Sequence, residues 1–144
     1  MRRRTSNSAL RCRLGSALLL LSTVAVADES RLTAQLSCRP EAAPGRVLCE
    51  LRYAVDAGAR LAWVDALVTA SPEFARPLRS RVTPERFFPA AAAERKLSLA
   101  FVASKPGVGD VTVRARAVVC RGAGEQERCR PQVQDVHGAL RVGS

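Results

Sequence analysis

Side chains that usually carry catalysis or stack on ligands are scarce in this chain of 144 residues. It has one His, one Trp, one Tyr and one Met, and aromatic residues make up 4% of the sequence. Sites that need several imidazoles are therefore excluded, and a nucleic-acid groove lined with stacking aromatics has little to be built from. The single imidazole, His137, follows Asp135 near the C-terminus, and we expect it to be a surface residue without a partner.

Sequence motifs of hydrolases and nucleotide-binding proteins are also missing. No serine lies in a Gly-x-Ser-x-Gly setting. Gly107 and Gly109 join two predicted strands and do not open a helix, so they do not form a phosphate-binding loop. Glu125 and Glu127 lie in a loop among arginines, which is typical of solvated charge. We therefore expect no catalytic residue and no cofactor.

The N-terminus has the pattern of an export signal. Five arginines precede an uncharged, largely apolar run over residues 14–27 that ends in Ala25-Val26-Ala27. Small residues at these positions are typical of cleavage by signal peptidase, here before Asp28. The run is shorter than the roughly 20 residues that a membrane-spanning helix needs, so a retained anchor is the alternative and not our prediction. We predict a cleaved signal peptide over 1–27, a periplasmic or extracellular location, and no membrane span after cleavage.

Removing this segment halves the formal net charge. The whole chain has 23 Lys and Arg against 13 Asp and Glu, a net charge of +10, and cleavage leaves 18 against 13, a net charge of +5. Arginines gathered near the C-terminal cysteines form a candidate anion-binding corner: Arg114, Arg116, Arg121, Arg128 and Arg130. Solvated surface charge is the alternative. No aromatic residue lies between Val111 and Ser144, so we expect no nucleic-acid partner.

Four cysteines remain after cleavage, an even number in an exported chain, which favours disulfides. Pairing Cys38 with Cys49 and Cys120 with Cys129 would enclose ten and eight residues, and both loops are rich in turn-forming residues. We predict these two local disulfides. Structural zinc sites usually present cysteines two to four residues apart, so we expect no metal.

A second pairing stays open. Cys49, Trp63 and Cys120 resemble the Cys, Trp, Cys rhythm of immunoglobulin domains, in which a disulfide joins the two sheets. Alternation argues against it, because Cys120 shares the polar face of its predicted strand with Arg114 and Arg116. A β-bulge would reverse that parity.

Alternating apolar residues predict short strands throughout the mature chain. Turns separate them, and no sustained helical periodicity occurs. We predict one immunoglobulin-like antiparallel β-sandwich domain over 28–144, with Trp63 as a core anchor and strands at 32–38, 47–55, 61–70, 78–82, 97–103, 110–120 and 139–142.

The C-terminal part suggests one enzymatic alternative. The strand that ends at Cys120, the loop, the sequence Cys129-Arg130-Pro131 and the final strand resemble the end of the periplasmic N-terminal domain of bacterial thiol:disulfide interchange reductases. The resemblance implies an immunoglobulin-like sandwich in which Cys120 and Cys129 cycle between dithiol and disulfide. A structural disulfide is the other interpretation of the same residues.

The sequence predicts a small exported β-sandwich without catalytic activity that serves as a protein-binding or structural module. We expect its partner to be another protein. Thiol:disulfide exchange through Cys120 and Cys129 is the alternative function, and the oligomeric state is not predicted.

Overall fold

The computed structural model describes residues 31–84 and 92–143, which are almost entirely β-strand. The strands are β1 (Leu32–Cys38), β2 (Gly45–Val55), β3 (Ala59–Ala70), β4 (Ala75–Pro77), β5 (Arg81–Val82), β6 (Glu94–Ala103), β7 (Gly107–Arg121) and β8 (Arg128–Val142). A short 3-10 turn, η1 (Gly124–Gln126), connects β7 to β8. Within the described ranges, no helix is long and apolar enough to cross a membrane. The predicted signal peptide lies outside them.

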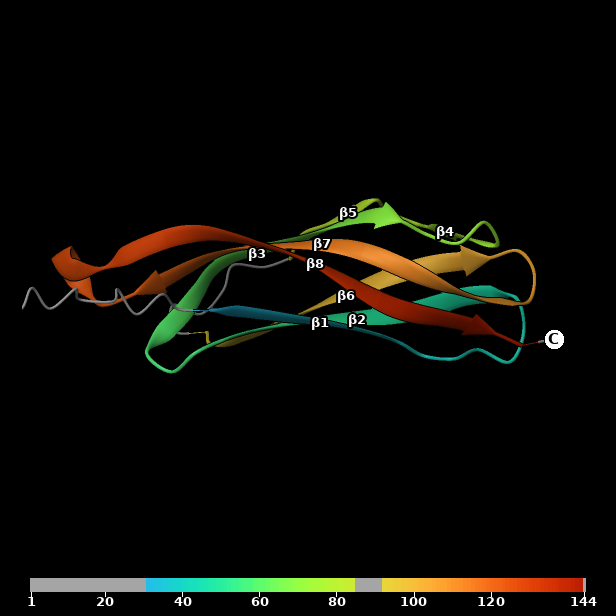
Figure 1. Ribbon diagram of the computed structural model, residues 1–144, viewed down its shortest axis with the longest axis horizontal. Coiled ribbons are helices and arrows are strands. Elements are labelled where there is room, and N and C mark those ends of the chain that lie inside the picture. Colours follow the sequence, from blue (N-terminus) through green and yellow to red (C-terminus); the bar gives the residue numbers. More distant parts are fainter. Residues whose placement is uncertain (1–30, 85–91, 144) are drawn as a thin grey trace, which may run out of the picture.

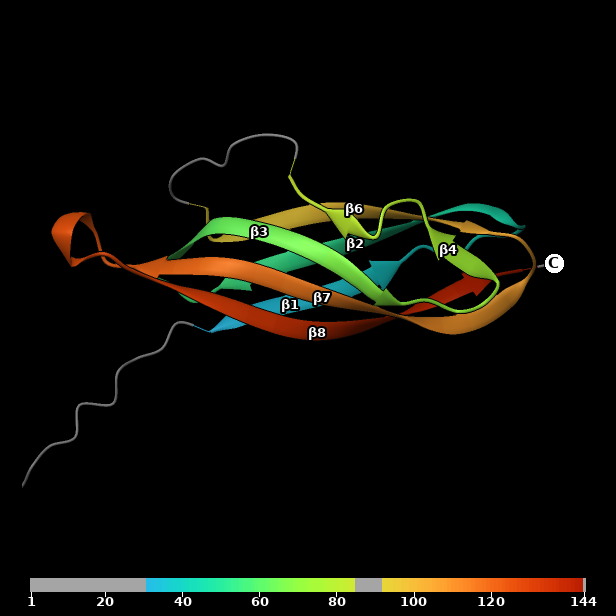
Figure 2. The same cartoon turned by 90° about the horizontal axis from the view of Figure 1, so that it is seen from above.

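The strands form two antiparallel sheets that pack face to face (Figures 1 and 2). Sheet I has the order β1-β2-β6-β4, and sheet II has the order β5-β3-β7-β8. The β7–β8 hairpin runs past the other strands at one end of the molecule (Figure 1). The predicted all-β sandwich is confirmed, and residues 31–143 contain its strands.

The core follows the alternation in the sequence. Residues of β2, β6 and β7 that alternate with polar neighbours are buried between the sheets, among them Val47, Leu51, Leu99, Phe101, Val111, Val113 and Ala115. Burying one face of each sheet is the main source of stability in such a sandwich, at about 25 cal/mol per Å² of apolar surface removed from water.

Edge strands β1 and β8 close one side of the sandwich. Side chains of β8 cover the open edge of β1. The Gln132 and Gln134 Oε1 atoms accept hydrogen bonds from the backbone N–H groups of Leu32 and Ala34 at 2.8 and 3.0 Å. Farther along, the Glu41 N–H donates to the Arg141 carbonyl at 3.0 Å. These contacts protect an edge that would otherwise present open donors.

Two expectations about β3 and β8 are wrong. Trp63 is not a core anchor: it lies on the outer face of sheet II and is 37% exposed. The reason is a β-bulge between Leu61 and Trp63, which shifts the pairing with β7 by one residue and turns Trp63 outward. The last strand is also much longer than 139–142, since β8 begins at Arg128 and pairs with β7 along 15 residues.

Tyr53 of β2, unlike Trp63, is among the largest side chains buried in the core. Its side chain is fully buried, and its hydroxyl donates a hydrogen bond to the Asp65 backbone carbonyl of the opposite sheet at 2.5 Å. Burial first, and then the nearby Asp65 carboxylate, raises the pKa of the Tyr53 hydroxyl above its ordinary value near 10.

Tyr53 is the single tyrosine in the chain, so its ionisation can be followed directly by phenolate absorbance. We expect the folded protein to show no phenolate signal at pH 10, whereas the protein in guanidinium titrates near pH 10. Because folding raises the pKa of Tyr53, its neutral hydroxyl favours the folded state. This stabilisation is complete below pH 10 and is lost as the pH rises through the raised pKa. Tyr53→Phe should abolish both the signal and that part of the pH dependence. Half-ionisation of the folded protein near pH 10 would contradict this.

Candidate functional site

The outer face of sheet II carries an apolar patch beside the β7–β8 hairpin. Trp63, Val118 and Pro131 lie side by side across β3, β7 and β8, and Val133 lies two residues farther along β8. Val133 is 61% exposed, and Pro131 is exposed as well. We call these four residues the tryptophan patch. In the part of the chain that the structure describes, neither sheet covers this face.

A buried carboxylate supports the patch. The next row across the sheet consists of Asp65, Arg116 and Val133. Asp65 is fully buried although it lies on the outer face, because Arg116 and Arg81 cover it. The Nε atoms of these arginines contact its two oxygens, Oδ1 and Oδ2, at 2.7 Å each, and Arg116 makes a second contact through Nη2. A buried charge is tolerated when it is paired and hydrogen-bonded in this way.

Arg116 links this carboxylate to the exposed indole. Its Cζ atom lies 5.9 Å from the centre of the Trp63 ring, within the range of a cation–π interaction. The hydrogen bonds to Asp65 raise the pKa of Arg116 above its ordinary value, so the guanidinium stays charged. A charged guanidinium thus lies against the exposed indole of Trp63.

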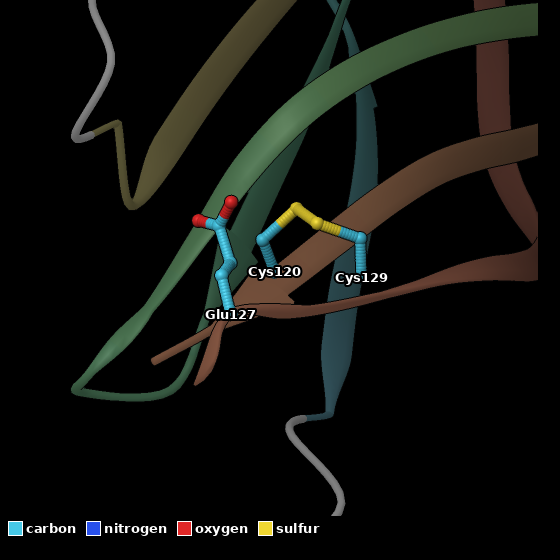
Figure 3. Close-up of side chains that lie close together, drawn as sticks. All are labelled: Cys120, Glu127 and Cys129. Atoms are coloured by element: carbon cyan, nitrogen blue, oxygen red, sulfur yellow. A yellow bond between two sulfur atoms is a disulfide. The ribbon is translucent and has the colours of Figure 1, made fainter. Parts of the chain in front are cut away.

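The second disulfide lies next to the patch. Cys120 and Cys129 face each other across β7 and β8, two residues beyond Val118 and Pro131. The Cys120 side chain is 1% exposed, whereas Cys129 is exposed. Figure 3 shows the Glu127 carboxylate close to the two joined sulfurs. Arg60 of β3 fixes that carboxylate, because its Nε and Nη2 atoms both contact Oε1 at 2.8 Å.

The disulfides are those of the local pairing, Cys38–Cys49 and Cys120–Cys129. The inter-sheet bond between Cys49 and Cys120 is not formed. Cys49 points into the core, whereas Cys120 lies on the outer face of sheet II, as alternation along β7 indicates.

The predicted arginine corner consists largely of arginines with partners. Arg114 forms a bidentate ion pair with Asp135 at 2.9 and 3.0 Å, and these hydrogen bonds lower the pKa of the Asp135 carboxyl. Arg128 donates to the backbone carbonyls of Glu125 and Glu127 at 3.1 and 3.0 Å. Arg116 binds Asp65, and Arg121 and Arg130 also have partners. Anion binding at this corner stays a prediction, and an anion would have to compete with these contacts.

A groove of about 640 Å³ between β1 and β8 brings together Ser37, Asp135 and His137. Their contacts do not form a catalytic relay, because Asp135 is engaged by Arg114 and the His137 Nδ1 atom lies 3.1 Å from the Thr112 hydroxyl. His137 is exposed, as expected, but it does have a partner.

Sequence reasoning missed Asp65 and the outward position of Trp63. A signal was present: Asp65 interrupts the apolar run of β3, and a charged residue two positions from Trp63 shares its face of a strand. That spacing indicates that Trp63 belongs to the polar face. The bulge itself has no such marker.

The buried carboxylate can be tested by substitution. Asp65→Asn keeps the shape but turns an N–H group toward two guanidiniums, so we expect the free energy of unfolding to fall by about 2–3 kcal/mol. Trp63 is the single tryptophan, and its fluorescence should also change as Arg116 loses its anchor. The matched control is Asp135→Asn, whose exposed ion pair should matter little. Equal effects of the two substitutions in denaturant unfolding would contradict the role of Asp65.

Comparisons with known proteins assign no family to the chain. No protein-family model matches it, and no curated protein matches it. Among solved structures, a crystal structure of BslA, a bacterial hydrophobin, is similar at a TM-score of 0.33 and 9% sequence identity. The match covers 78% of this chain and 96% of BslA. A likeness this low carries no conclusion about function.

Proposed function

We propose that this protein is an exported, non-catalytic module that binds another protein through the tryptophan patch. The observation that carries the proposal is the exposed indole of Trp63. Arg116 forms a cation–π contact with this indole and is itself hydrogen-bonded to Asp65. Tryptophan and arginine are the residues most enriched among the dominant contacts of protein interfaces. A side chain that is already ordered loses less conformational entropy on binding, which favours affinity.

The charges around the patch favour a partner segment with an apolar centre and acidic flanks. Arg81 and Arg116 share the single carboxylate of Asp65, so these three side chains together keep a net positive charge. Arg128 at the hairpin donates hydrogen bonds to the backbone carbonyls of Glu125 and Glu127, which do not neutralise its charge. Complementary charge at the rim of an interface raises the association rate and selects partners.

Export is part of the proposal. Two disulfides in a domain of this size are typical of proteins that fold in an oxidising compartment. The predicted signal peptide over 1–27 agrees with this, and both support the proposed periplasmic or extracellular location.

The test is capture of a partner from the exported proteins of the source cells, followed by measurement of affinity with the purified pair. We expect Trp63→Ala to weaken binding about 10-fold or more, as is usual for a central tryptophan of an interface. Val133→Asp should weaken it as well, since it places a charge in the patch.

The matched control is Leu78→Ala, which removes an exposed apolar side chain outside the patch. This variant should bind like the unchanged protein, and thermal unfolding should verify that all three variants fold. Partners whose binding survives both Trp63→Ala and Val133→Asp would contradict the proposal.

Thiol:disulfide exchange is the second candidate, and the exposure of Cys129 beside the buried Cys120 favours it. An attacking thiolate needs one accessible sulfur, and the other sulfur leaves. In a graded dithiothreitol series, exchange predicts that Cys120–Cys129 opens before Cys38–Cys49, in the folded protein, at a potential above about −300 mV. If peptide mapping shows that both bonds persist until the fold is lost, the exchange function is contradicted.

A further inference from the structure

The hairpin places a carboxylate, that of Glu127, beside the Cys120–Cys129 disulfide, which does not require it. Eight residues separate Cys120 from Cys129 in the sequence, but the two cysteines lie directly opposite each other in the β7–β8 pairing, and Glu127 returns to them from the loop (Figure 3). One potential ligand atom from each of the three lies within 4.8 Å of the other two. The spacing rule that argues against zinc concerns cysteines on a single turn, so it does not apply to cysteines joined by strand pairing.

Arg60 binds the carboxylate of Glu127 and orients it. Both of its contacts fall on Oε1 of Glu127, at 2.8 Å, and the two side chains are about one-third exposed. The carboxylate is thus bound through Oε1, and we assign the other oxygen, Oε2, as the metal ligand. Outer hydrogen bonds of this kind orient the ligands of metal sites.

We propose that reduction of Cys120–Cys129 opens a binding site for a divalent metal ion of the zinc type, with the two thiolates and the Glu127 carboxylate as ligands. Zinc takes four ligands in a tetrahedron and accepts cysteine sulfur and carboxylate oxygen. Three protein ligands leave the fourth position to water. The site does not depend on the tryptophan patch or on the proposed partner.

A dithiol donor reduces the Cys120–Cys129 bond: the sulfur–sulfur bond breaks, the donor becomes a disulfide, and two electrons and two protons pass to Cys120 and Cys129. The metal ion then replaces the two thiol protons, which are released. Because the metal binds only the reduced form, it favours reduction, and reoxidation releases it.

The other disulfide supplies an internal control. Cys38 and Cys49 are also opposite each other on paired strands. Within residues 31–84 and 92–143, however, the three-ligand groups include only the one at the hairpin. Reduction of Cys38–Cys49 should therefore create no comparable site.

The experiment uses the purified protein, reduced anaerobically with a phosphine that is then removed, and titrated with Co²⁺ as a spectroscopic substitute for Zn²⁺. The phosphine takes up oxygen from water as the two thiols form. We expect thiolate-to-cobalt absorption bands that saturate at one equivalent and that Zn²⁺ abolishes. The oxidised protein should show none.

Variants identify the ligands. Cys129→Ser should abolish the bands, and Glu127→Gln should lower the affinity by at least the roughly 10–100-fold that is usual for outer-shell partners of metal sites. Glu125→Gln, in the same loop, and the double variant Cys38→Ser/Cys49→Ser should bind like the unchanged protein. Circular dichroism of each reduced sample reports whether the fold persists.

Absence of the bands would overturn the proposal, as would bands that do not depend on Glu127. Loss of the fold on reduction would also overturn it, because an unfolded chain does not hold Glu127 beside the sulfurs. The partner-binding test with Trp63→Ala uses the oxidised protein, so the two proposals fail separately.

Discussion

The position of β7 between β3 and β8 is the constraint on which the rest of the molecule depends. Its pairing with β8 extends over 15 residues, and its pairing with β3 crosses most of the same length. Because side chains alternate between the two faces of a strand, a shift by one residue would exchange the core with the surface. The observed register sets Arg116 opposite Asp65 and Cys120 opposite Cys129, so both sites follow from one alignment.

Among residues 31–84 and 92–143, Asp65 is the one charged residue that is fully buried. Asp65 is buried beneath two arginines on the outer face of a sheet, and its own backbone carbonyl accepts the hydrogen bond of Tyr53 from the core. The same residue thus connects the interior of the domain to the surface. A partner that contacts Trp63 would meet an indole that is linked through Arg116 and Asp65 to Tyr53 in the core, and this linkage supports the proposed binding role.

Alternation in the sequence predicted the parts of the fold where it is strict. The strands around Leu51, Leu99 and Val113 and their buried faces are as predicted, and so are the hairpins closed by the two disulfides. The first half of β8 was missed because it carries Pro131 and polar residues on both faces, so no apolar face marks it. That half is held by its pairing with β7 and by Gln132 and Gln134, which are long-range contacts that no local pattern reveals.

The candidate site was less predictable for a related reason. The β-bulge before Trp63 depends on how β3 and β7 align, and the meeting of Glu127 with the cysteines depends on how the hairpin loop returns. The arginines of the candidate anion-binding corner have partners that the sequence does not indicate, as Arg114 with Asp135 shows. Sequence gives the charges but not which of them neutralise one another.

The most direct test of the central claim is an NMR titration of the isotope-labelled protein with its captured partner. Trp63 supplies the single indole N–H signal of the chain, and it can be followed without ambiguity. We predict that this signal and the amide signals of Val118 and Val133 shift first and saturate together. Shifts confined to the outer face of sheet I, around Leu48 and Val102, with an unchanged indole signal would contradict the account.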